Sequence, residues 1–243
     1  MSASKLNAYK KWAISRNHAF GDERGPEMAV GGEFYAFGVV EREMLRHYGL
    51  TDETYLVDVG CGSGRLSQAL ARSHKGRYLG IDIVPALVKH AEVEASRPDW
   101  RFETVDKIGI PEIDGAADMV CMFSVLTHLL HEQSYLYLEE AKRVLRSGGT
   151  IVISFLEFAM ASHWAVFEST LQSHRTMQEE PLNTFIERNV FECWAAHLGL
   201  TVEEFRRGDD PFVPLPELLT LDSGTVMKDF GCLGQSICVL SKP

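Results

Sequence analysis

The sequence predicts an α/β fold, a doubly wound, mostly parallel sheet of seven strands with helices on both faces. From Tyr55 onward, short β-branched runs alternate with segments whose apolar residues recur at helical spacing, a pattern typical of a parallel sheet covered by helices. Three glycines follow the first run directly, at the place where open α/β sheets bind ligands. With 243 residues, the chain is expected to form a single domain.

Five core strands are predicted, and helical segments separate most of them. Their ranges are 55–59, 77–84, 101–105, 117–125 and 150–156. Pro85 stands where the first residue of a helix is expected, because the preset φ of proline and its missing N–H are tolerated there. The Gly148-Gly149 pair is expected to end the helix that precedes the fifth strand.

The alternation of strand-like and helical segments ends after Glu157. A long helical region at about 159–198 leads to a strand-like piece at 201–207, and another strand-like piece closes the chain at 235–242. These two pieces are expected to pair as an antiparallel hairpin at one edge of the sheet. The core pattern needs neither the segment before the first strand nor the insertion after the fifth. We therefore expect both to cap a pocket at the carboxyl ends of the strands.

The composition limits the partners and the compartment. A formal net charge of −10 disfavours nucleic acid, because a polyanion would be repelled on average. Five cysteines without a CxxC pair disfavour a disulfide framework and a structural zinc site, and no cluster with metal-ligand spacing stands out. No apolar stretch approaches the ~20 residues of a membrane span, and no secretory signal is evident. A cytoplasmic protein that has no membrane segment and binds no metal is expected.

The three glycines favour a loop that brings bare backbone N–H groups against a ligand. A dinucleotide site needs Gly-x-Gly-x-x-Gly. Counted from Gly60, the chain has Gly62 but places Arg65 where the third glycine belongs, and its extra glycine comes one residue early, at Gly64. The phosphate-binding GxxxxGK[ST] loop is absent. A nicotinamide-dependent oxidoreductase therefore remains only an alternative.

The spacing Asp58-x-Gly60-x-Gly62-x-Gly64 resembles motif I of the class I S-adenosylmethionine-dependent methyltransferases. Asp82 after the second strand and Asp106 after the third match acidic positions of that family. The segment "EEAKRVLRSGGTIVIS" is similar to the family's usual helix, glycine turn and fifth strand. The resemblance covers residues 55–156, and four motifs in the right order make it specific.

This resemblance implies S-adenosylmethionine as the cofactor and assigns roles to particular residues. Asp82 would accept hydrogen bonds from the two ribose hydroxyls. Asp106 would lie near the adenine amino group, and Asp58 would hold the glycine-loop amides and, through water, the methionine ammonium. The cofactor-binding residues implied are Asp58, Gly60, Cys61, Gly62, Gly64, Asp82, Ile83, Asp106, Lys107 and Phe123. The domain would then divide into a helical cap (1–45), a cofactor-binding core (50–156) and a cap insertion with C-terminal strands (157–243).

In this family the end of the fourth strand lies beside the sulfonium, so residues 123–133 are the candidates for chemistry. They lack the Asn-Pro-Pro-Tyr sequence of amino-group methylases, which weighs against DNA methylation. His128 could accept a hydroxyl proton, since its unperturbed pKa is about 6.5. It could equally pack at the start of the next helix, with Thr127 as a cap. His131 is a second candidate.

Aromatic residues in the two capping segments are candidates for the acceptor pocket, because aromatic walls suit a planar or apolar molecule. The alternative is that they belong to the core. The candidates are Tyr9, Trp12 and Phe20 before the first strand, and His163 and Trp164 after the fifth.

The sequence thus predicts methyl transfer to a small molecule, with a hydroxyl oxygen as the expected acceptor atom. Besides the oxidoreductase, two alternatives stay open: a non-catalytic S-adenosylmethionine-binding regulatory module, and a protein or RNA methyltransferase. The sequence does not indicate the oligomeric state.

Overall fold

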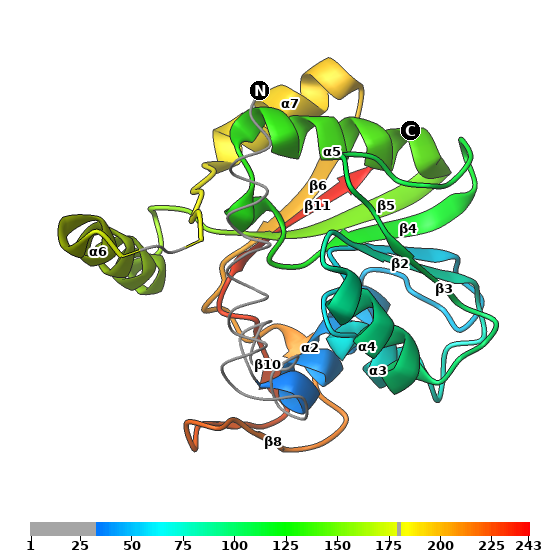
Figure 1. Ribbon diagram of the computed structural model, residues 1–243, viewed down its shortest axis with the longest axis horizontal. Coiled ribbons are helices and arrows are strands. Elements are labelled where there is room, and N and C mark those ends of the chain that lie inside the picture. Colours follow the sequence, from blue (N-terminus) through cyan, green and yellow to red (C-terminus); the bar gives the residue numbers. More distant parts are fainter. Residues whose placement is uncertain (1–32, 179–180) are drawn as a thin grey trace.

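The computed structural model describes residues 33–178 and 181–243, and within them a seven-stranded sheet has the order β3-β2-β1-β4-β5-β11-β6 (Figure 1). Neighbours from β3 to β5 pair in parallel, whereas β11 is antiparallel to both of its neighbours. The strands are β1 Leu56–Val59, β2 Tyr78–Asp82, β3 Arg101–Thr104, β4 Ala117–Met122, β5 Leu145–Phe155, β6 Thr201–Arg206 and β11 Ser236–Ser241. The predicted fold class is confirmed.

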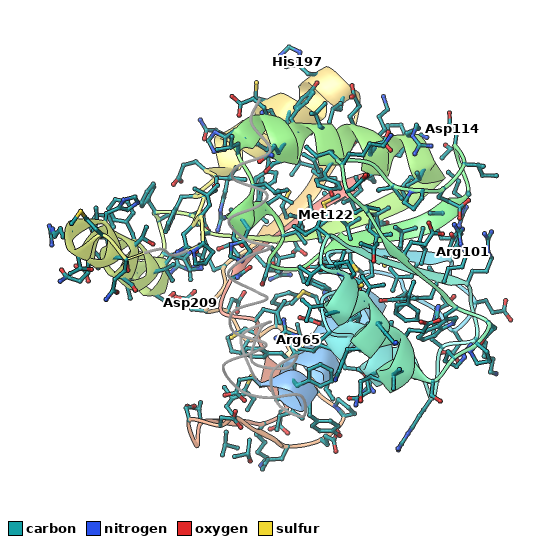
Figure 2. All side chains as sticks on the ribbon, viewed as in Figure 1. Arg65, Arg101, Asp114, Met122, His197 and Asp209 are labelled. Carbon is teal, nitrogen blue, oxygen red and sulfur yellow. The ribbon has the colours of Figure 1, made fainter. Side chains whose placement is uncertain are left out.

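Helices cover both faces of the sheet. In Figure 1, α2, α3 and α4 lie on one side of the strands, α5 and α7 lie on the other, and α6 projects away from the body. The helices are α2 Phe34–His47, α3 Arg65–Leu70, α4 Pro85–Ala95, α5 His131–Val144, α6 Ala161–Thr176 and α7 Arg188–Leu198, with a short 3-10 turn at Leu126–His128. Each face has its own cluster of buried apolar residues. Figure 2 shows Met122 of β4 in the middle of the molecule and His197, Arg101 and Asp209 at its periphery. None of the described helices is long and apolar enough to cross a membrane.

The helix α2 belongs to the core, which corrects the expectation that the core does not need the segment before the first strand. Val40, Met44 and Leu45 are fully buried on the face that packs toward the sheet and α3. Glu41 lies on this same buried face. The segment therefore contributes one of the covering helices and also brings an ionisable group into the interior.

The Gly148-Gly149 pair was expected to end a helix, but it lies inside β5. The helix α5 already ends at Val144, and β5 begins at Leu145. Gly148 has a φ of 77°, and a Cβ on Gly149 would lie 2.8 Å from Leu145 Cδ2. The pairing of β4 with β5 shifts register at this point. The glycines therefore allow an irregularity inside the strand.

The long helical region expected at 159–198 is two helices. The helix α6 ends at Thr176, because Met177 adopts the left-handed conformation with a φ of 53°, and Pro181 then disfavours a helical continuation. Residues 181–187 are not helical, and Phe185 forms an isolated parallel bridge to Leu156 beyond β5. Pro181 marks this break in the sequence, but apolar residues at helical spacing continue beyond it, which favoured a single long helix.

The two C-terminal strands pair as expected, and β11 lies between β5 and β6. The chain between them contains four two-residue strands that form two small sheets, β7 with β10 and β8 with β9. These strands are β7 Val213–Pro214, β8 Leu219–Thr220, β9 Val226–Met227 and β10 Phe230–Gly231. They were not expected from the sequence, because strands of two residues leave no periodicity to detect.

A buried carboxylate ties the C-terminal elements to the end of β5. Glu157, 1% exposed, accepts hydrogen bonds from Arg188 Nε (2.9 Å) and Nη2 (2.8 Å) at the start of α7. It also accepts one from Ser236 Oγ (2.5 Å) at the start of β11. Burial raises the pKa of Glu157, but the bonds from Arg188 and Ser236 outweigh it and hold that pKa below its usual value. The ionised carboxylate thus joins three elements beside the strand ends.

Candidate functional site

A cavity of about 290 Å³ opens at the carboxyl ends of the central strands. The loop from β1 to α3 and the end of β2 line one side of it, and the segments after β4 and β5 line the other. In an open α/β sheet this is the edge where ligands bind. Of the predicted cofactor residues, the cavity wall includes Asp58, Gly60, Cys61, Gly62, Asp82, Ile83 and Phe123.

The glycine loop is held by backbone groups at the end of β2. The N–H groups of Gly60 and Cys61 donate to the carbonyl of Ile81 at 2.7 and 3.0 Å. Gly60 and Gly62 have φ values of 74° and 53°, in the region that favours glycine. A Cβ on Gly60 would lie 2.4 Å from Val125 Cγ2 after β4. The bare backbone therefore lets the segments after β1 and β4 approach each other at the cavity.

Asp82 connects the glycine loop to the start of α4. Its Oδ2 accepts the Gly62 N–H at 3.1 Å, and its Oδ1 accepts the Val84 N–H at 2.9 Å. Burial raises the pKa of Asp82 above its usual value, while these amide bonds oppose the shift. Because each carboxylate oxygen can accept two hydrogen bonds, both retain capacity for a ligand. The side chain is thus oriented in advance at the cavity wall.

Asp58 has partners other than the predicted glycine-loop amides, which are occupied by Ile81 and Asp82. Its Oδ2 accepts the Tyr78 hydroxyl at 2.6 Å, and its Oδ1 accepts the Cys121 thiol at 3.5 Å. Burial raises the pKa of Asp58 to about 6, and the bond from Tyr78 limits the rise. The buried Asp58 carboxylate therefore takes up a proton more readily than an exposed aspartate does.

An ion pair that the sequence analysis missed lies next to Asp58. Arg65 Nε of α3 is 3.2 Å from Glu41 Oε1 of α2, and both residues line the cavity; Figure 2 labels Arg65. Burial raises the pKa of Glu41 to about 7, against the opposing effect of Arg65. The sequence did contain one indication that Glu41 is buried. It lies four residues from both Phe37 and Leu45, and therefore on the apolar face of the helix.

Three predicted cofactor positions lie away from the cavity wall. Gly64 immediately precedes α3 and has a φ of 95°, and a Cβ there would lie 2.7 Å from Ala91 Cα, so this glycine allows α3 to pack against α4. Asp106 and Lys107 are exposed beyond β3. Their neighbour Val105 lines the cavity instead, which makes the contact from this loop apolar.

His128 lines the cavity on the side of β4. Its Nδ1 lies 2.8 Å from the Leu182 carbonyl, and because a carbonyl only accepts, Nδ1 carries the hydrogen. Burial lowers the pKa of His128, so the ring is neutral at pH 7 and Nε2 carries the lone pair. Thr127 donates to the Ser124 carbonyl at 2.9 Å and stabilises the turn. A neutral imidazole at the cavity wall is a group that can accept a proton.

The remaining candidates lie elsewhere. His131 contacts the Phe185 carbonyl (3.2 Å) and Trp194, at a separate surface hollow. His163 is buried and donates from Nε2 to the Gly234 carbonyl at 2.9 Å, which is a structural contact. Trp164 is 45% exposed and packs on Phe158 and Phe167, outside the cavity. Three more candidates lie outside the described residues: Tyr9, Trp12 and Phe20.

Comparisons with known proteins agree with this architecture. The family described as "Methyltransferase domain" matches residues 57–153. The chain is 32% identical over 181 residues to a mitochondrial ubiquinone biosynthesis O-methyltransferase of Candida albicans, covering 70% of this chain and 54% of that protein. It is 29% identical over 153 residues to a chloroplastic tocopherol O-methyltransferase of Arabidopsis thaliana, covering 58% of this chain and 43% of that protein.

Solved structures show the same fold at low sequence identity. A SAM-dependent methyltransferase of Methanosarcina mazei aligns with a TM-score of 0.59 and 18% identity, covering 82% of this chain and 96% of that one. Magnesium protoporphyrin IX methyltransferase of Synechocystis, with SAH bound, aligns with a TM-score of 0.58 and 15% identity, covering 87% and 86%.

The fold, the glycine loop and the family match together confirm the class predicted from the sequence. Residues 57–153 match the methyltransferase-domain family, and the fold is that of the class I S-adenosylmethionine-dependent methyltransferases. The chain spans between 54% and 61% of the length of the first curated relatives it matches.

Replacing Gly60 with alanine is expected to destabilise the protein more than replacing Gly224 does. Both residues have a strongly positive φ, but a Cβ at Gly224 meets nothing within 4 Å. Each substitution should lower the free energy of unfolding by about 1 kcal/mol, because alanine disfavours a positive φ. The contact with Val125 should add about 1–3 kcal/mol at Gly60. Urea unfolding of both variants measures the difference, and equal losses would contradict the close approach.

Proposed function

We propose that the protein transfers a methyl group from S-adenosylmethionine to a hydroxyl oxygen of a small molecule. The observation that carries the proposal is a single cavity with two different halves. Ionisable groups and the glycine loop line one half, and an uncharged wall with a neutral histidine lines the other. O-methyltransferases of small molecules among the relatives support the same reaction.

The residues of the first half fit the cofactor. Asp82, already oriented by two amides, would accept the ribose hydroxyls. The carboxylates of Asp58 and Glu41 complement the positive ammonium and sulfonium, and Arg65 complements the carboxylate of the methionine part. Val105 offers an apolar contact to the adenine base. The set contains acceptors for each cationic or hydroxyl group and a donor for the anionic one.

The second half would position the acceptor and take its proton. When bound, S-adenosylmethionine supplies a methyl group on a positively charged sulfur, which leaves as a neutral thioether once the acceptor oxygen bonds to the methyl carbon. The walls formed by Val125, Leu129 and Leu156 exclude water and favour alignment of the acceptor. His128 Nε2 would accept the hydroxyl proton as the carbon–oxygen bond forms.

The cytoplasmic location expected from the composition stays a prediction. The relatives named above include mitochondrial and chloroplastic enzymes, so their names do not favour a cytoplasmic location over another.

Among the described residues, no group of three or more His, Cys, Asp or Glu side chains could hold a metal ion.

Incubation with methyl-labelled S-adenosylmethionine and pools of small hydroxylated compounds tests the proposal. We expect label in an organic product and formation of S-adenosylhomocysteine by the wild type. The Asp82→Ala variant should bind S-adenosylhomocysteine about 30-fold more weakly, as for the loss of a charged hydrogen bond of about 2 kcal/mol. Titration calorimetry measures this affinity. Absence of micromolar binding by the wild type would overturn the proposal.

The His128→Ala variant should lower turnover by about 10²-fold or more, within the range typical of a lost general base. Affinity for S-adenosylhomocysteine should stay within twofold, because His128 lies on the acceptor side of the cavity. The matched control is His131→Ala, whose ring lies at the separate hollow and whose loss should leave turnover unchanged. Equal turnover in the wild type and the His128 variant would remove the base role.

Affinity for S-adenosylhomocysteine should fall as the pH decreases from 7.5 to 5.5. Asp58 and Glu41, with pKa values of about 6 and 7, become protonated over this range and lose their attraction for the ammonium group. In Tyr78→Phe the Asp58 pKa should rise, because the hydrogen bond that lowers it is gone.

The decrease in affinity for S-adenosylhomocysteine should therefore begin at higher pH in Tyr78→Phe and should be shallower in Asp58→Asn. Calorimetry at several pH values measures both profiles. Identical pH profiles in all three proteins would show that Asp58 does not face the ligand's ammonium.

A further inference from the structure

Gln235 reaches the cavity because β11 runs against the other strands. It immediately precedes Ser236, which pairs with Phe155 at the carboxyl end of β5. An antiparallel strand begins at the edge where its parallel neighbours end, so Gln235 lies at the same edge as Leu156. Both residues line the cavity.

A relay of hydrogen bonds fixes the orientation of the Gln235 amide. The Ser124 N–H donates to Ser154 Oγ at 2.7 Å, and the Ser154 hydroxyl donates to Gln235 Oε1 at 2.7 Å. Ser154 is only 1% exposed, so its hydroxyl proton needs a protein acceptor. With Oε1 assigned as that acceptor, the other end of the amide is the Nε2 donor group. Among the described residues, none accepts a hydrogen bond from it.

The relay begins at a strained residue. Ser124 follows β4 with a φ of 58°, a conformation that is strained for a non-glycine residue. Strain of this kind persists where surrounding contacts hold it, and here the bond to Ser154 is one such contact. The end of β4, the end of β5 and the start of β11 are thereby coupled at one point of the cavity wall.

The surroundings of Gln235 define what its donor group can bind. The charged groups of the cavity, Glu41, Asp58, Arg65 and Asp82, come from α2, β1, α3 and the end of β2. The end of β1 is separated from the start of β11 by β4 and β5 in the sheet order.

The wall on the Gln235 side includes Leu156, Val166 and Asn183. The amide of Asn183 donates to Thr170 Oγ1 at 2.9 Å. The partner that best matches an N–H donor in this uncharged, mainly apolar setting is a neutral oxygen acceptor.

We propose that Gln235 is a specificity-determining residue that donates an N–H to a carbonyl or ether oxygen of an uncharged, mainly apolar methyl acceptor. The bond positions the acceptor so that its hydroxyl faces the reacting methyl group and His128. This inference rests on the proposed function, in which the cavity takes a methyl acceptor. It adds a substrate class: hydroxylated compounds with a second, hydrogen-bond-accepting oxygen.

The test uses pairs of ring compounds that differ in that one oxygen. 3-Hydroxyacetophenone with 3-ethylphenol, and 3-methoxyphenol with 3-ethylphenol, are suitable, together with their para-substituted counterparts. Binding to the protein loaded with S-adenosylhomocysteine is measured by NMR titration. In at least one pair, the oxygenated member should bind the wild type about five- to tenfold more tightly, as for one hydrogen bond of about 1 kcal/mol.

Gln235→Leu removes the donor with little change in volume and should abolish the preference by weakening only the oxygenated member. Ser154→Ala leaves the amide free to turn and should reduce the preference partly. Both variants should retain the wild-type affinity for S-adenosylhomocysteine. A preference that persists in Gln235→Leu, or no preference in any pair with the wild type, would overturn the inference.

The two proposals fail in different ways. If the wild type does not bind S-adenosylhomocysteine, the proposed function fails, and the pairs measured on the free protein still report on Gln235. If S-adenosylhomocysteine binds and labelled product forms while no pair shows a preference, only the role of Gln235 fails.

Discussion

The hydrogen bonds from the glycine loop to the end of β2 are the constraint on which the site depends. The carbonyl of Ile81 accepts two loop amides, and the carboxylate of Asp82 accepts a third. Asp82 also accepts the amide of Val84, so the same carboxylate fixes the start of α4. The loop after one strand therefore takes its shape from the end of its neighbour. Because the two strands are paired in parallel, ligand contacts from both are aligned before any ligand arrives.

The parts of the site that could be predicted are formed by residues that lie close together in the sequence. A buried strand, three glycines and a helix within 15 residues specify the loop, and Asp82 follows from the end of the next strand. The partners of Asp58 were not accessible in this way. Tyr78 and Cys121 belong to neighbouring strands, and only the strand order and register bring them to the carboxylate.

Two of the missed residues come from segments that the repeating β-α pattern does not include. Glu41 precedes the first strand and Gln235 precedes the last, yet both line the same cavity. Placing them requires the tertiary arrangement, α2 against α3 for one and β11 between β5 and β6 for the other. The wrong helix boundaries have a different origin, since the irregularity at Gly148 and the break after Thr176 depend on local conformation rather than on apolar periodicity.

The two halves of the cavity are formed by different segments of the chain, and this affects how the sequence of such a protein can change during evolution. The chain from 207 to 235 crosses from β6 to β11 through two small sheets, while β11 itself is anchored by its pairing with β5. Insertions or substitutions in this crossover can reshape the wall at Gln235 and leave the register of the central strands untouched. Descendants of one ancestor can thus acquire new acceptors while inheriting the nucleoside site intact.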